Sequence, residues 1–131
     1  MKGVMTKRKR NWKDGYKVVL VSRSGELLSA TIGKADGGCV TYCPGVETVP
    51  LPKCGPLCVF TSFEYADKFR GIPHQIWRCK YKPTQKTCVW LSDLLTALSI
   101  EDLPDGTALA DAVVLTEKVS DDEIQKAKEE L

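Results

Sequence analysis

The stretch that decides the fold opens with Cys39-Val40-Thr41-Tyr42-Cys43-Pro44-Gly45 and runs to Arg70. After a proline-rich connection it continues as Pro56-Leu57-Cys58-Val59-Phe60-Thr61-Ser62. The first piece alternates in a way typical of a short strand, and Pro44-Gly45 ends it. The apolar run 57–60 predicts a strand that is buried on both faces. Thr61 or Ser62 can cap a helix near 62–70, with Glu64 at capping-box spacing from Thr61.

The same patterns recur on both sides of this stretch. Before it, 16–21 and 26–32 predict a hairpin around Gly25. After it, 75–81 alternates as a strand, and 87–90 is its predicted return strand. Ser92 can cap a short helix, 109–119 contains a strand, and Ser120 opens a last helix with acidic residues in its first turn.

We therefore expect a single α+β domain with a mixed, mainly antiparallel sheet of about five to seven strands. A helix near 62–70 packs on this sheet, and one or two helices follow in the C-terminal third. The predicted organisation is a flexible basic arm at 1–14, the α+β domain at 15–119 and an acidic C-terminal helix at 120–131.

Charge is distributed unevenly along the chain. Residues 1–17 hold seven basic residues and one acidic residue, whereas 101–131 hold three basic and ten acidic residues. The adjacent cations Lys7, Arg8, Lys9 and Arg10 can contact nucleic-acid phosphates, but the favoured interpretation is a solvated tail. Trp12 is unusual in such an arm, because an exposed aromatic ring usually docks on something.

The cysteines allow three interpretations. Cys39, Cys43, Cys54 and Cys58 resemble a four-thiolate zinc site in outline, but the pairs are separated by three residues instead of two. An extended strand would place Cys39 and Cys43 about 13 Å apart. Alternatively, antiparallel pairing would set 39 against 58, 43 against 54, 77 against 90 and 79 against 88, so that disulfides form. The favoured interpretation is buried, inert thiols, and no metal or other cofactor is expected.

Catalytic motifs are not evident in the sequence. His74 is the only histidine, and no acid or serine lies at motif spacing from it. A small enzyme remains an alternative, with His74 or Glu26 in a polar pocket. No apolar run is long enough to cross a membrane, and no secretory signal is recognisable. The expected location is therefore the cytoplasm, with reduced thiols.

Several segments resemble small uncharacterised proteins encoded by phages and prophages. They are Tyr16–Val19, Glu26–Ala30, Gly55–Leu57, Ala66–Phe69, Ile76–Cys79, Pro104–Ala110 and Val113–Leu115, together with Tyr42, Gly45, Val59 and Phe60. The resemblance covers about residues 15–118. It implies a viral or mobile-element origin, and hence the host cytoplasm, but no catalytic residues.

Two binding functions follow as hypotheses. The first is a non-enzymatic protein of phage type that binds a host or viral macromolecule, for example as an inhibitor of a defence system. The second is a nucleic-acid-binding module that uses Lys7, Arg8, Lys9, Arg10 and Trp12. The sequence does not indicate the oligomeric state.

Overall fold

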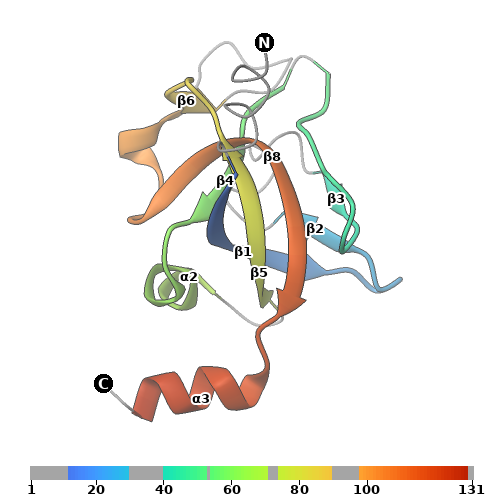
Figure 1. The fold of residues 1–131 in the computed structure, drawn as a ribbon, viewed down its shortest axis with the longest axis vertical. Coiled ribbons are helices and arrows are strands. Elements are labelled where there is room, and N and C mark those ends of the chain that lie inside the picture. Colours follow the sequence, from blue (N-terminus) through green and yellow to red (C-terminus); the bar gives the residue numbers. More distant parts are fainter. Residues whose placement is uncertain (1–11, 30–39, 53, 71–73, 90–97, 130–131) are drawn as a thin grey trace, which may run out of the picture.

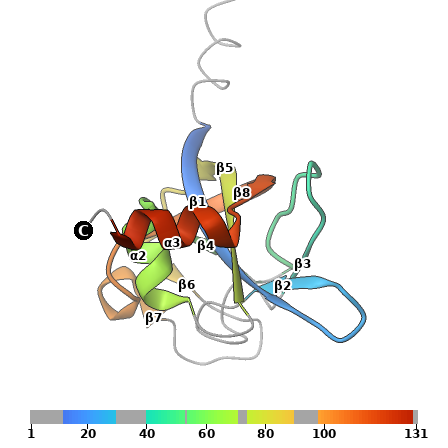
Figure 2. The ribbon, with the colours of Figure 1, turned by 90° about the horizontal axis from the view of Figure 1, so that it is seen from below.

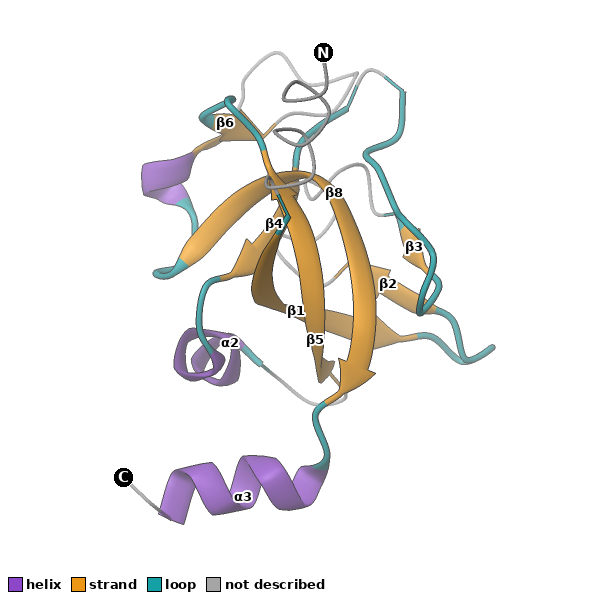
Figure 3. Cartoon of the chain, viewed as in Figure 1, coloured by secondary structure: helices purple, strands orange, loops and turns teal. Residues whose placement is uncertain are grey.

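The structure is a computed structural model that describes residues 12–29, 40–52, 54–70, 74–89 and 98–129 (Figure 1). Strands form the larger part of the regular secondary structure, and helices flank them (Figure 3). The elements are β1 (Lys13–Val21), β2 (Leu27–Ser29), β3 (Thr41–Tyr42), β4 (Leu57–Phe60), α2 (Phe63–Phe69), β5 (His74–Pro83), β6 (Cys88–Val89), β7 (Leu98–Ser99), η2 (Ile100–Asp102), β8 (Thr107–Lys118) and α3 (Asp121–Glu129). The predicted α+β class, the sheet, the helix near 62–70 and a C-terminal helix are confirmed.

Four strands close into a barrel. β1 pairs with β4, β4 with β8, β8 with β5, and β5 with β1 again. Every pairing among the described strands is antiparallel. β2 and β3 extend the sheet from β1. The chain after β3 then returns to β8, where Thr48 and Val113 exchange backbone hydrogen bonds of 2.8 and 2.9 Å.

Side-chain alternation fills the barrel from all of its walls. Val19 of β1, Tyr42 of β3, Val59 of β4, Tyr81 of β5 and Val113 of β8 belong to one buried interior cluster. Because alternate residues point outward, β4 also contributes to two satellite clusters. This double role explains why all four β4 residues are buried, as the apolar run at 57–60 predicts.

The satellite clusters pack under the helices and under the β6–β7 pair. Phe60 and Ile76 meet Ala66 of α2 and Ile124 of α3. Cys58 packs with Val89, Leu103 and Leu109. Seen from below, α3 runs across one end of the barrel next to α2 (Figure 2). No helix of the described residues has the length and apolar character needed to cross a bilayer.

The two helices begin at specific caps. The Ser62 hydroxyl accepts a hydrogen bond from the Tyr65 amide at 3.4 Å, so Ser62 is the N-cap of α2. The predicted capping box from Thr61 to Glu64 is therefore wrong by one residue. At α3 the box is complete: the Glu123 amide donates to Ser120 Oγ and the Ser120 amide donates to Glu123 Oε1, both at 3.1 Å.

The predicted strand registers around the cysteines are wrong. β3 pairs with β2, and Cys58 faces Leu109 of β8, so β3 and β4 are not partners; Cys39 lies outside the described residues. Cys79 faces Gly15 and Leu115, whereas Cys88 faces Ser99 of β7. Closure of the barrel explains why Cys58 and Cys79 have other partners than predicted. Both β4 and β5 use one edge to pair with β1 and the other to pair with β8. Residues 90–97, including the helix predicted after Ser92, lie outside the described residues.

Candidate nucleic-acid interface

The outward side of β5 carries a row of cations. Arg78, Lys80 and Lys82 occupy alternate positions, while Cys79 and Tyr81 between them point into the barrel. Arg78 forms ion pairs with Glu117 at 3.3 Å and Glu123 at 2.5 Å, and Lys80 pairs with Asp14 at 2.5 Å. Carboxylates thus neutralise two of the three cations.

Lys82 has a different neighbour. Its Nζ lies 5.3 Å from the centroid of the Trp12 ring, within the range of a cation–π contact. No carboxylate of the described residues forms an ion pair with Lys82. Trp12 itself is half-buried and immediately precedes β1. The indole ring is therefore held beside a cation at the first residue of the described chain.

A cavity of about 430 Å³ opens next to this pair. Lys13 and Pro83 line this cavity, and each is the next residue in the chain after a member of the pair, Trp12 or Lys82. Lys13 lies on the same side of β1 as the interior residue Val19, at the end of the barrel. The residues that line the cavity are Lys13, Thr61, Tyr81, Pro83, Thr84, Lys86, Thr87, Ile100, Ala108 and Leu109. The cavity lining thus combines apolar side chains, three threonine hydroxyl groups and two lysines.

Backbone hydrogen bonds hold the loop that forms one wall of the cavity. The Thr84 amide donates to the Leu109 carbonyl at 3.2 Å, and the Ile100 amide donates to the Thr87 carbonyl at 2.9 Å. The Lys86 amide donates to Thr84 Oγ1 at 3.2 Å. These bonds connect the loop to β8 and to η2, so Lys86 is presented from a braced wall.

We call the surface formed by Trp12, Lys13, Lys82 and Lys86 the mouth surface. Two exposed acidic residues, Glu101 and Asp102, follow the cavity residue Ile100 in η2. The arm residues Lys7, Arg8, Lys9 and Arg10 lie outside the described residues. In the sequence only Asn11 separates Arg10 from Trp12.

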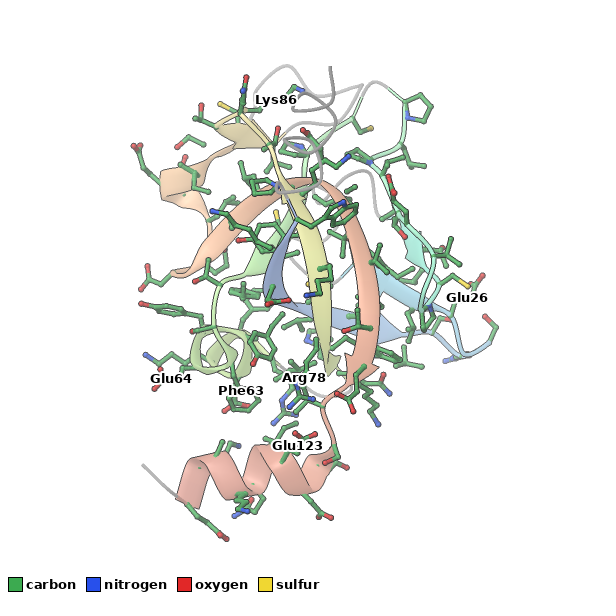
Figure 4. The ribbon with its side chains drawn as sticks, in the orientation of Figure 1. Glu26, Phe63, Glu64, Arg78, Lys86 and Glu123 are labelled. Atoms are coloured by element: carbon green, nitrogen blue, oxygen red, sulfur yellow. The ribbon has the colours of Figure 1, made fainter. Side chains whose placement is uncertain are left out.

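The opposite end of the molecule is acidic. Figure 4 shows Lys86 at one end and Glu123 at the other, with Arg78 close to Glu123. The pKa of Glu123 is lowered to about 2, first by the hydrogen bond from Arg78 and then by that from the Ser120 amide. The hydrogen bond to Glu123 in turn raises the pKa of Arg78. Among the described residues, the acidic first turn of α3 thus lies at the end of the molecule opposite Lys86.

A buried lysine lies between these ends, and sequence reasoning missed it. Lys17 is fully buried, its Nζ donates to the Cys58 carbonyl at 2.6 Å and lies 5.3 Å from the Tyr42 ring centroid. Burial raises the pKa of the neighbouring Cys79 thiol to about 12, although Lys17 opposes this shift. The one signal for Lys17 in the sequence is its place on the Val19 side of β1.

The predicted cysteine and histidine sites are dispersed. Cys43 is exposed, Cys54 is half-buried and Cys58 is buried in a satellite cluster. Among the described residues no group of three or more His, Cys, Asp or Glu could hold a metal ion, and Cys39 lies outside them. His74 lies against Phe69, and burial followed by Arg70 lowers its pKa.

Further surface cavities include one beside β1 and three that are lined by α2 residues. Neither His74 nor Glu26, the residues considered for an enzyme, lines these four cavities or the cavity between Lys13 and Lys86. A separate apolar surface is formed by Val46, Val49 and Leu51, which are 54%, 52% and 45% exposed. Comparison of the chain with protein-family models, with curated proteins and with solved structures yields no match.

Proposed function

We propose that this protein binds nucleic acid through the mouth surface. The observation that carries the proposal is Lys82 over the Trp12 ring, beside a cavity lined by Lys13 and Lys86. Lysines attract phosphates and release their counterions, while an indole ring offers a stacking face to a base. The cations Lys7 to Arg10 join this surface along the sequence and would extend the contact to the backbone.

The acidic end of the molecule supports the same orientation. α3 carries Asp121, Asp122 and Glu123 in its first turn, and these would repel a polyanion. An approaching nucleic acid is therefore steered toward the mouth surface at the other end. Steering of this kind weakens as salt is added, because it acts over a Debye length of about 10 Å at 0.1 M ionic strength.

The test is binding of labelled oligonucleotides to the full chain across a salt series. The variant Lys13→Gln/Lys82→Gln/Lys86→Gln should bind more weakly, with a salt slope reduced by about 0.7 to 0.9 for each phosphate that is no longer bound. A matched control, Lys118→Gln/Lys126→Gln/Lys128→Gln, removes three lysines of the acidic end and should leave binding intact. Absence of binding at low salt, or equal binding by both variants, would overturn the proposal.

The arm is tested separately. Replacement of Lys7, Arg8, Lys9 and Arg10 by glutamine should weaken binding further and lower the salt slope again. If these four changes leave affinity and slope unchanged, the arm is a solvated tail and the mouth surface acts alone.

A second function, binding of a protein partner, is favoured by one observation. Val46, Val49 and Leu51 are exposed on the segment between β3 and β4, which the Thr48–Val113 hydrogen bonds hold to β8. Grouped apolar side chains on a fixed segment are typical of interaction sites. The phage-type origin and an inhibited host complex remain predictions from the resemblance. The unmodified chain and the variant Val46→Ser/Val49→Ser/Leu51→Ser are each immobilised and exposed to a cell lysate. The unmodified chain should retain a protein that the variant does not, and retention of the same proteins by both counts against this function.

A further inference from the structure

The geometry points to a single-stranded ligand: an unpaired nucleotide stacks on Trp12, and its neighbour occupies the cavity between Lys13 and Lys86. This inference rests on the proposed function and adds the class of nucleic acid to it. It concerns the described residues of the mouth surface only.

The first argument is the shape of the cavity. Its volume of about 430 Å³ lies in the range of pockets that enclose a small molecule. The lining includes Tyr81, Ile100 and Leu109, whose apolar side chains suit the flat face of a base. Bases of an intact duplex are stacked and paired, so they cannot enter such a cavity, whereas single-stranded bases can be splayed out.

The second argument is the placement of polar groups around these apolar side chains. Thr61, Thr84 and Thr87 contribute hydroxyls that can donate to or accept from the edge of a base. Lys13 and Lys86 lie on the cavity wall and can bind the phosphates on either side of the enclosed base. Because neither hydroxyls nor lysines select one base strongly, the expected ligand is single-stranded DNA or RNA with modest sequence preference.

The third argument is the Trp12–Lys82 pair. Lys82 Nζ lies over the indole face, so a base that stacks there displaces the ammonium to the edge of the ring, where it can bind the phosphate of the same nucleotide. A second aromatic–lysine pair lies elsewhere in the molecule: Lys68 Nζ is 6.0 Å from the Tyr65 ring centroid. The cavity beside this pair is lined by the acidic residue Asp105. Tyr65 and Lys68 therefore provide an internal control for an exposed aromatic–lysine pair.

The experiment measures binding of the full chain to oligothymidine, to oligouridine and to a duplex of equal length. Single strands should bind more tightly than the duplex, and the two single strands distinguish DNA from RNA as the source. Trp12→Leu should weaken single-strand binding roughly five- to 150-fold, as expected for loss of one stacked base. Trp12→Phe keeps a stacking face and should retain most of the affinity, while Tyr65→Ala should bind like the unmodified chain.

Melting temperatures identify variants that fail to fold. Among folded variants, the affinities of Trp12→Leu and Trp12→Phe for the single strands then show whether the ring at position 12 stacks on a base. A duplex bound as tightly as the single strands overturns the inference but leaves the proposed function standing. Equal affinities for Trp12→Leu and Trp12→Phe also overturn it. Absence of binding to all three probes overturns the proposed function as well.

Discussion

At the scale of single residues, Lys17 shows how the barrel tolerates an amine in its interior. The Lys17 side chain is fully buried, with Nζ over the Tyr42 ring and donating to the Cys58 carbonyl. A buried polar group is costly unless it is hydrogen-bonded, so this bond is what allows a lysine at that position. The side chain therefore contributes both packing and a hydrogen bond.

Two substitutions separate these contributions. Lys17→Ala removes the stem and should lower the free energy of unfolding by about 2–5 kcal/mol, the usual cost of truncating a long core side chain. Lys17→Met keeps the length and removes the ammonium group with its hydrogen bond, so the expected decrease is smaller, about 1 kcal/mol. Urea unfolding of the three proteins measures the difference. Equal decreases would mean that the hydrogen bond, and not packing, dominates at this site.

Two glycines with the same backbone conformation form a second matched pair. Gly25 and Gly106 have φ of 91° and 80°, which an L side chain adopts only at a cost. A Cβ at Gly25 would meet nothing within 4 Å, whereas one at Gly106 would lie 2.1 Å from the Tyr65 ring. Gly25→Ala should therefore cost about 1 kcal/mol, and Gly106→Ala about 1–3 kcal/mol more from overpacking.

Thermal or urea unfolding checks this order directly. The double variant Gly106→Ala/Tyr65→Ala removes the ring but keeps the Tyr65 Cβ, which would lie 2.6 Å from the added Cβ, so it should relieve part of the extra cost and not all of it. A Gly106→Ala protein as stable as Gly25→Ala would contradict the close approach of α2 to the β8 turn.

At the scale of elements, α3 depends on few contacts. Ile124 is its buried residue, the Ser120–Glu123 box caps it, and Arg78 ties Glu123 to β5. Because Arg78 also contacts Glu117 of β8, one guanidinium connects three elements. The attachment of α3 is therefore electrostatic to a large degree and should respond to pH.

The direction of that response follows from the pKa of Glu123. Its value in the folded chain, about 2, lies below the ordinary 4.5, so the carboxylate form stabilises the folded state. This contribution is complete above about pH 4.5 and disappears as pH falls toward about 2. The protection factors of the α3 amides, which correct the observed exchange for its intrinsic pH dependence, should fall over that window. Glu123→Gln should show lower protection at neutral pH and no further loss from this carboxyl, and an unchanged protection profile in acid would contradict the assignment.

At the scale of the whole molecule, local patterns predicted the elements and the β1–β2 hairpin around Gly25, but not the strand pairings between segments farther apart in the chain. The apolar run at 57–60 and the Ser62 and Ser120 caps depend on neighbours in sequence, and these predictions are confirmed. The registers assumed for Cys58 and Cys79 are wrong because hairpin arithmetic cannot include a barrel that closes β5 onto both β1 and β8.

In the candidate site, too, one residue could be recognised from the sequence and the others could not. Trp12 is noticeable in the sequence because an aromatic residue is unusual in a basic arm. Its partner Lys82 is distant in sequence and becomes its neighbour only when the end of β5 lies beside the start of β1. Lys13 and Lys86 are ordinary surface lysines until the cavity between them is seen. Long-range strand pairing thus creates the mouth surface, and local reasoning has no access to it.

The barrel should fold without α3 but not without β8. α3 contributes Ile124 to a satellite cluster, whereas β8 supplies Ala110, Val113 and Leu115 to the interior and pairs with both β4 and β5. A chain that ends at Val119 should therefore unfold cooperatively, with a stability lower by about 2 kcal/mol because the isoleucine is no longer buried. A chain that ends at Gly106 leaves β4 and β5 with open edges and should not fold. Thermal melts followed by circular dichroism distinguish the two. If the chain ending at Val119 shows no cooperative transition, α3 is an integral part of the core and not an attachment to a closed barrel.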